Sequence, residues 1–176
     1  VLTLLSNIIT SQNYFLEKYE PYNNSILSPE EFLGYEIGFQ HTRHDQIVNY
    51  LTYLSTVSNK ADIINYGKTH EGRKLVILTI TSESNLNSLN DIQKEHLKNT
   101  IPGESISLND DLPIIINLGY GVHGNEPSSS EAALLSAYTL VASKNKKIEK
   151  FRENSVIFIL SFYCKKYTCI TFDIKF

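Results

Sequence analysis

The stretch PIIINLGYGVHGNEPSSSEAALL, residues 113–135, determines the fold into which the rest of the chain must fit. Ile114, Ile115, Ile116 and Leu118 predict a strand that is buried on both faces, because short apolar runs bounded by turn residues are typical of covered sheet strands. Glycines interrupt the segment that follows and allow a sharp turn. The stretch therefore predicts a strand, a tight loop and the start of a helix.

His123 and Glu126 lie in this loop, where open α/β sheets place their ligand sites. Pro127 keeps Glu126 out of the helical conformation, and Ser128 and Glu131 have the spacing of a capping box. Imidazole and carboxylate groups both bind Zn²⁺, and catalytic zinc sites combine three protein ligands with water. The residues alone leave two interpretations open, namely part of a zinc site or a glycine-rich turn with a polar pair.

The composition is that of one globular domain: 176 residues, of which 41% are hydrophobic and 20% charged. The net charge is −3 and the basic residues are dispersed, which argues against a nucleic-acid surface. The first nine residues, VLTLLSNII, are too few to span a bilayer. They suit the end of a secretion signal or an apolar terminus, and we expect a secreted or periplasmic protein without a membrane span.

The sequence before this stretch predicts an arm, a helix and a hairpin. Residues 12–39 have little periodicity, with one helical turn expected after Ser28 and Pro29. Thr42 and Asp45 resemble an N-cap pair for the first helix, and Gly72 supplies the turn of the hairpin. The elements expected from periodicity are a helix at 43–57, strands at 62–68 and 74–81, and a helix at 89–99.

Other histidines also invite a metal interpretation. His41 and His44 are three residues apart at the start of the first helix, where histidines are more often plain polar residues. His96 lies on a charged helix face and is expected to be solvated.

Two further elements complete the prediction. Residues 129–143 form a helix with a broad apolar face, and residues 155–160 form another buried strand. The expected architecture is α/β, with a mixed, mostly parallel sheet flanked by helices.

The segment GVHGNEPSSSEAALL resembles the first metal-binding motif of zinc carboxypeptidases of the carboxypeptidase A type. The resemblance extends over about residues 34–159 and includes HTRHDQIVNYLTYLS and YGKTHEGRKLVILTITS. It implies that His123 and Glu126 are the first two ligands of one zinc ion. It also implies a peptide or protein substrate that is cut at its C-terminal peptide bond. Asn125 stands where some members carry a substrate-binding arginine.

After residue 159 the sequence, LSFYCKKYTCITFDIKF, no longer resembles this family. The family's third ligand, a histidine, and its glutamate general base are therefore expected beyond the end of this chain, which implies an incomplete and inactive form. Cys164 and Cys169 suit a disulfide, a metal site or an altered gene end. The expected organisation is a signal remnant and arm at 1–39, a partial catalytic domain at 40–160 and a divergent tail at 161–176.

Two other functions remain open. Zinc amidohydrolases of the aspartoacylase or succinylglutamate desuccinylase type carry a similar loop, although the first helix and the hairpin favour the carboxypeptidase. The missing ligand and base also suit a non-catalytic remnant.

Overall fold

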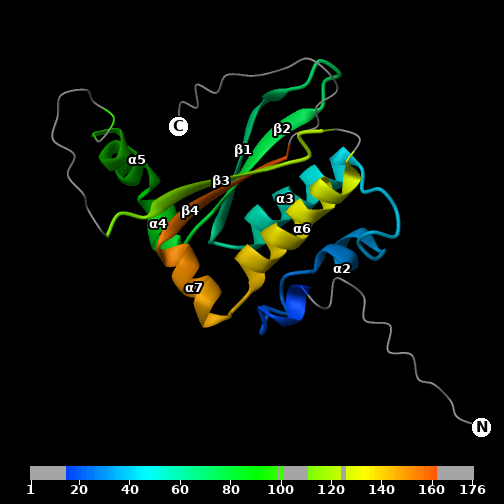
Figure 1. Ribbon diagram of the computed structural model, residues 1–176, viewed down its shortest axis with the longest axis horizontal. Coiled ribbons are helices and arrows are strands. Elements are labelled where there is room, and N and C mark those ends of the chain that lie inside the picture. Colours follow the sequence, from blue (N-terminus) through cyan, green and yellow to red (C-terminus); the bar gives the residue numbers. More distant parts are fainter. Residues whose placement is uncertain (1–14, 99, 101–110, 124–125, 162–176) are drawn as a thin grey trace, which may run out of the picture.

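A computed structural model describes residues 15–98, 100, 111–123 and 126–161 of the chain. Its centre is a four-stranded sheet with the strand order β1-β2-β4-β3 (Figure 1). The strands are β1 (Ala61–Lys68), β2 (Lys74–Ile80), β3 (Ile114–Tyr120) and β4 (Ser155–Ser161).

The sheet is mixed, as the sequence predicts. β1 pairs with β2 and β2 with β4 in antiparallel fashion, whereas β3 and β4 run parallel from Ile114↔Ser155 to Tyr120↔Ser161. The described strands thus include one parallel pair, which differs from the mostly parallel sheet that we expected.

Helices cover both faces of the sheet (Figure 1). The longest, α3 (His44–Val57) and α6 (Pro127–Ala142), share the larger core cluster with Leu78, Ile157 and Ile159. On the opposite face, Ile92 packs with Val156 and Phe158. Ile92 belongs to α5, and the remaining helices are shorter: α2 (Pro29–Leu33), α4 (Glu83–Asn87), α5 (Leu89–Lys98) and α7 (Lys146–Glu153).

The prediction that β3 is buried on both faces is wrong. Ile114 and Ile115 are 57% and 43% exposed. Among the described strands β3 lies at the edge of the sheet, and its partly buried side chains, Ile116, Leu118 and Tyr120, all lie on the one face that packs against the larger cluster. The strands buried on both faces are β2 and β4. Val76 and Leu78 of β2 join the larger cluster and Ile77 the smaller one, and β4 likewise contributes Ile157 to the larger and Val156 to the smaller.

The described part of the N-terminal arm packs against the helices. A capping box at Ser28 and Glu31 starts α2, which confirms the predicted helical turn. The rings of Tyr22 and Tyr138 stack with their centroids 4.8 Å apart. The Tyr50 hydroxyl donates to the carbonyl of Leu27 at 3.0 Å. These contacts join the arm to both α3 and α6.

Candidate metal centre

The connection from β3 to α6 carries both predicted zinc ligands. β3 ends at Tyr120, and Gly121 follows with φ +71°, a left-handed conformation that favours glycine. The backbone N–H of Glu126 donates to the carbonyl of His123 at 3.1 Å, and Pro127 then begins α6. His123 and Glu126 therefore stand at the two ends of one tight turn.

Both side chains are exposed to solvent. Within the part of the chain that the structure describes, neither makes a side-chain hydrogen bond. An imidazole and a carboxylate at the ends of one turn suit two positions of a zinc site, which requires nitrogen or oxygen donors that converge on one point. The residues present thus fit a partial ligand set. Asn125, the predicted substrate contact, lies outside the described residues.

Two hydrogen bonds tie the end of β3 to α6. Gly121 N–H donates to Ser129 Oγ at 2.9 Å, and the Tyr120 hydroxyl donates to Ser136 Oγ at 2.9 Å. Ser129 lies just past the candidate loop, and Ser136 lies about two helical turns further along α6. The loop is therefore closed at its base by Gly121 and Ser129.

The predicted capping box at Ser128 and Glu131 is wrong, because the N-cap of α6 is Glu126, whose side chain makes no capping hydrogen bond. Glu131 is instead buried, and its Oε1 accepts hydrogen bonds from Thr42 N–H (3.1 Å) and Thr42 Oγ1 (3.0 Å). A sequence signal for this burial exists, since Glu131 precedes Leu134 and Tyr138 by three and seven residues on the apolar face.

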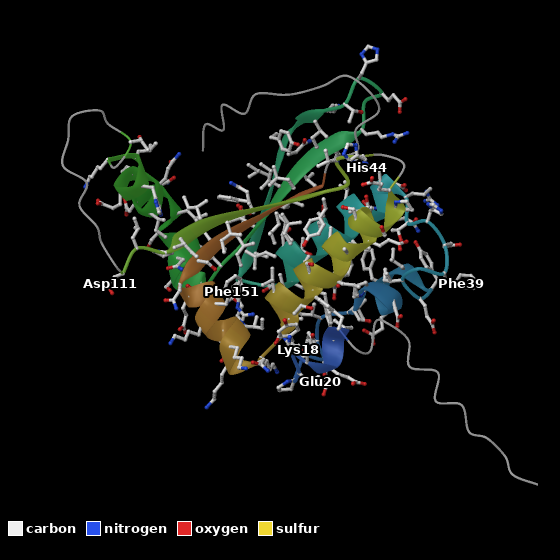
Figure 2. All side chains as sticks on the ribbon, viewed as in Figure 1. Lys18, Glu20, Phe39, His44, Asp111 and Phe151 are labelled. Carbon is white, nitrogen blue, oxygen red and sulfur yellow. The ribbon has the colours of Figure 1, made fainter. Side chains whose placement is uncertain are left out.

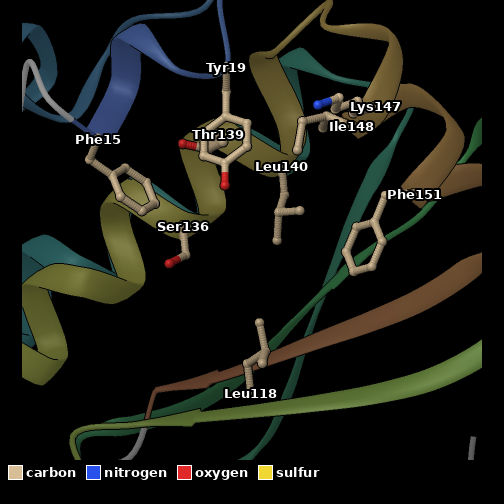
Figure 3. A pocket seen from close by; sticks show the side chains of 9 residues that line it. All are labelled: Phe15, Tyr19, Leu118, Ser136, Thr139, Leu140, Lys147, Ile148 and Phe151. Atoms are coloured by element: carbon tan, nitrogen blue, oxygen red, sulfur yellow. The ribbon is translucent and has the colours of Figure 1, made fainter.

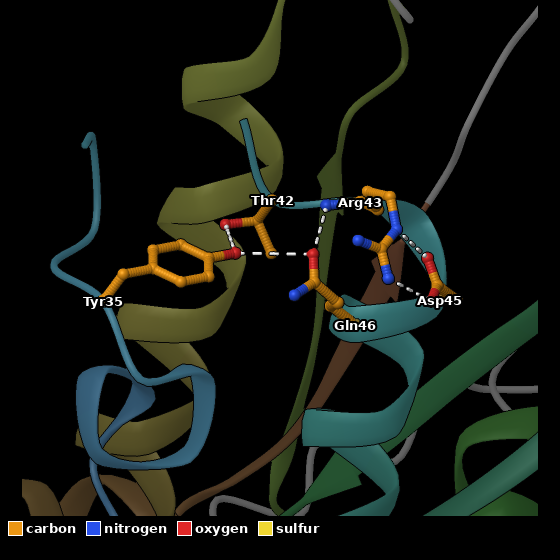
Figure 4. Close-up of polar contacts among 5 residues, drawn as sticks. All are labelled: Tyr35, Thr42, Arg43, Asp45 and Gln46. Atoms are coloured by element: carbon orange, nitrogen blue, oxygen red, sulfur yellow. Dashed lines mark hydrogen bonds and ion pairs between the residues drawn. The ribbon is translucent and has the colours of Figure 1, made fainter. Parts of the chain in front are cut away.

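Thr42 has a different role from the predicted N-cap. The N-cap of α3 is Arg43, whose N–H donates to Gln46 Oε1 at 3.1 Å. The Tyr35 hydroxyl donates to Thr42 Oγ1 at 3.1 Å, and Arg43 pairs with Asp45 at the surface (Figure 4). Thr42 thus links the arm to α6.

The other histidines do not join the candidate centre. His41 is exposed, whereas His44 is buried at the start of α3 (Figure 2). Burial, followed by the positive charge of Arg73, lowers the pKa of His44 below its usual value. His96, which was expected to be solvated, is half-buried and lies 2.8 Å from the Pro113 carbonyl through Nε2. In residues 15–98, 100, 111–123 and 126–161, no group of three or more His, Cys, Asp or Glu residues could hold a metal ion. Cys164 and Cys169 lie outside these ranges.

A cavity of about 380 Å³ lies between the arm, α6, α7 and β3 (Figure 3). Its lining is largely apolar and includes Phe15, Leu118, Leu140 and Phe151. None of its described lining residues belongs to the loop with His123 and Glu126. The cavity is therefore separate from the candidate metal centre.

Comparisons with known proteins identify the family and the fold. The sequence model of the zinc carboxypeptidase family matches residues 47–162. The fold is similar to the crystal structure of the carboxypeptidase A from Helicoverpa armigera, with a TM-score of 0.50 and 17% sequence identity. That alignment covers 85% of this chain and 29% of the insect enzyme, so the chain spans less than a third of the enzyme's length. A search of curated proteins found no significant match.

Proposed function

Because this chain belongs to the zinc carboxypeptidase family, we propose that it is part of a metallocarboxypeptidase, in which His123 and Glu126 hold one zinc ion. The observation that carries the proposal is the turn closed by the Glu126 N–H and the His123 carbonyl. This turn carries an exposed imidazole at one end and an exposed carboxylate at the other, directly after β3. The substrate is a peptide or protein with a free C-terminus.

Zinc, when bound, polarises the scissile carbonyl and lowers the pKa of a water ligand. The chain's own contribution is to hold two donors on a short, closed loop. In this role His123 binds the metal as the neutral imidazole. Within the described residues no other acidic group accompanies Glu126 at this loop, and we assign the general base and the third ligand to residues outside them.

A direct test is to titrate Zn²⁺ into the 176-residue chain and to monitor binding by the NMR signals of the histidine imidazoles. We expect a dissociation constant weaker than micromolar, since two ligands rarely hold zinc against water. His123→Ala should abolish the zinc-dependent change in chemical shift at this site. His70→Ala, which alters an exposed histidine in the β1–β2 turn, should leave that change in chemical shift as it is. Equal binding by the His123→Ala variant would place the metal elsewhere. Tight stoichiometric binding would reveal a further ligand, such as His70 or a cysteine of the tail.

Activity is tested on the full-length natural protein with three substrates. We expect hydrolysis of a blocked peptide with a free C-terminal carboxylate, and none of the same peptide as its C-terminal amide. Hydrolysis of N-acyl amino acids instead would favour the alternative amidohydrolase of the aspartoacylase or succinylglutamate desuccinylase type. We expect no turnover by the 176-residue chain alone, and a non-catalytic role would be supported if the full-length protein were also inactive.

We also propose a secreted or periplasmic location. None of the helices in the described residues is long and apolar enough to cross a bilayer. A signal-dependent export assay of the natural protein tests the location, and retention in the cytoplasm would contradict it.

A further inference from the structure

Ser129 forms a hydrogen bond with Gly121, at the start of the candidate loop, which the family assignment does not predict. It occupies the third position of α6, after Pro127 and Ser128, and its Oγ accepts the N–H of Gly121 at 2.9 Å. In a capping box, the side chain at this third position bonds to the N-cap backbone of its own helix. Here it reaches back to the residue that follows β3.

The hydrogen bond closes a small ring of chain. Gly121 stands before His123, and Ser129 follows Glu126, so both candidate ligands lie between the two bonded residues. The turn bond from Glu126 N–H to the His123 carbonyl lies inside the same ring. Each end of the loop is thereby fixed to a regular element, β3 on one side and α6 on the other.

Gly121, whose N–H is the donor, has a left-handed conformation with φ +71°, which sets the direction in which the chain leaves β3. A residue with a Cβ adopts this conformation only at a cost. Gly121 thus sets the turn out of β3, and Ser129, at the start of α6, supplies the acceptor of the hydrogen bond.

We propose that Ser129 is a positioning residue, whose hydrogen bond to Gly121 holds His123 and Glu126 in the arrangement that binds zinc. The inference rests on the proposed function. Metal binding requires both side chains at one point, and a loop that is already closed loses less conformational freedom when it binds.

Ser136 provides a matched control. It is a half-buried serine on the same helix, and its Oγ accepts a hydrogen bond from Tyr120 at the same length, 2.9 Å. Its bond also spans the loop, but it is made by the Tyr120 side chain and lies about two helical turns further along α6, away from the base of the loop. Ser129→Ala and Ser136→Ala should therefore cost similar stability in urea unfolding, while only the former alters the metal site.

The experiment titrates Zn²⁺ into the complete 176-residue chain and follows the His123 imidazole by NMR. We expect Ser129→Ala to weaken zinc binding by about 3- to 10-fold, the range that corresponds to ordering one side chain. Ser129→Thr, which keeps a hydroxyl, should restore most of the affinity, and Ser136→Ala should bind zinc as the unaltered chain does. Amide exchange of Gly121 in the metal-free protein should accelerate in Ser129→Ala alone.

The inference is overturned if Ser129→Ala binds zinc with unchanged affinity, or if Ser136→Ala loses as much. These outcomes differ from a failure of the proposed function, which would appear as unchanged zinc binding by His123→Ala. In that case both proposals fall, even if the Gly121 exchange rate still depends on Ser129.

Discussion

The buried carboxylate of Glu131 accepts both the backbone N–H and the hydroxyl of Thr42, two residues that are 89 positions apart in the sequence. Because Thr42 stands just before α3, this pair fixes the first turns of α3 and α6 to each other. Tyr35 extends the network to the arm through Thr42 Oγ1 (Figure 4).

Glu131→Ala should destabilise the fold by about 2 to 3 kcal/mol, since hydrogen bonds to charged groups contribute more than neutral ones and the donors of Thr42 stay buried. Thr42→Ala, which retains the backbone N–H bond, should cost about 1 kcal/mol. Urea unfolding followed by circular dichroism measures both free energies. Equal losses of unfolding free energy in the two variants would contradict the claim that Glu131 accepts both hydrogen bonds from Thr42.

Arg152 is the charged residue buried most deeply in the described chain, at 2% exposure. Its Nη1 donates to the carbonyls of Leu140 (2.7 Å) and Ser143 (3.1 Å), at the C-terminal end of α6. Arg152→Met should lower the free energy of unfolding by about 3 kcal/mol, because both carbonyls lose a buried donor. Lys150→Met, an exposed change on the same helix, is the control and should alter stability by under about 0.5 kcal/mol.

The lowered pKa of His44 predicts a pH dependence of stability. Burial is the main cause, with Arg73 next, and the charge of Asp45 and the backbone of Lys74 act in the opposite direction. The unfolded chain binds a proton near pH 6.5, whereas the folded chain does so only at lower pH. This contribution to stability is therefore present above pH 6.5 and is lost as the pH falls through the folded pKa.

Urea unfolding of the chain at pH 7.5, 6.5 and 5.5 measures this effect. The decrease in stability on acidification should shrink in His44→Gln and persist in His70→Gln, which changes an exposed histidine. An identical pH profile in all three proteins would refute the role of His44.

Among the described strands β3 has one unpaired edge, and we expect this edge to favour self-association, because exposed strand edges with apolar side chains pair with other chains. Ile115 is 43% exposed on this strand. Ile115→Lys should shift sedimentation at micromolar concentration towards the monomer. Val57→Lys, placed at the end of α3 with a similar exposure of 42%, adds the same charge and should leave association unchanged.

The sequence predicted the regular elements closely because their apolar periodicities are strong. The first long helix, the hairpin at Gly72 and the strand at 155–160 have the expected places. The positions of His123 and Glu126 after a strand and before a helix also follow from the sequence. Whether they bind zinc remains a prediction.

Tertiary contacts explain why the predictions for the burial of β3 and for the capping box of α6 were wrong. The exposure of β3 depends on which strands stand beside it, and an apolar run gives no information on that point. Ser129 and Glu131 lie in a segment with several possible capping residues, and their actual partners, Gly121 and Thr42, come from other elements. Short-range spacing favoured a local cap between Ser128 and Glu131, whereas Glu131 bonds to Thr42, 89 residues away in the sequence.

The parallel register of β3 and β4 brings Tyr120 and Ser161 level at the same rim of the sheet. A peptide joined to the end of either strand starts its path only one strand spacing, about 5 Å, from the other. Grafting a short histidine-bearing hairpin after β4 would thus deliver an additional donor to His123 and Glu126 with a small loop-closure entropy, and this rim is the natural place to engineer a complete metal-binding triad.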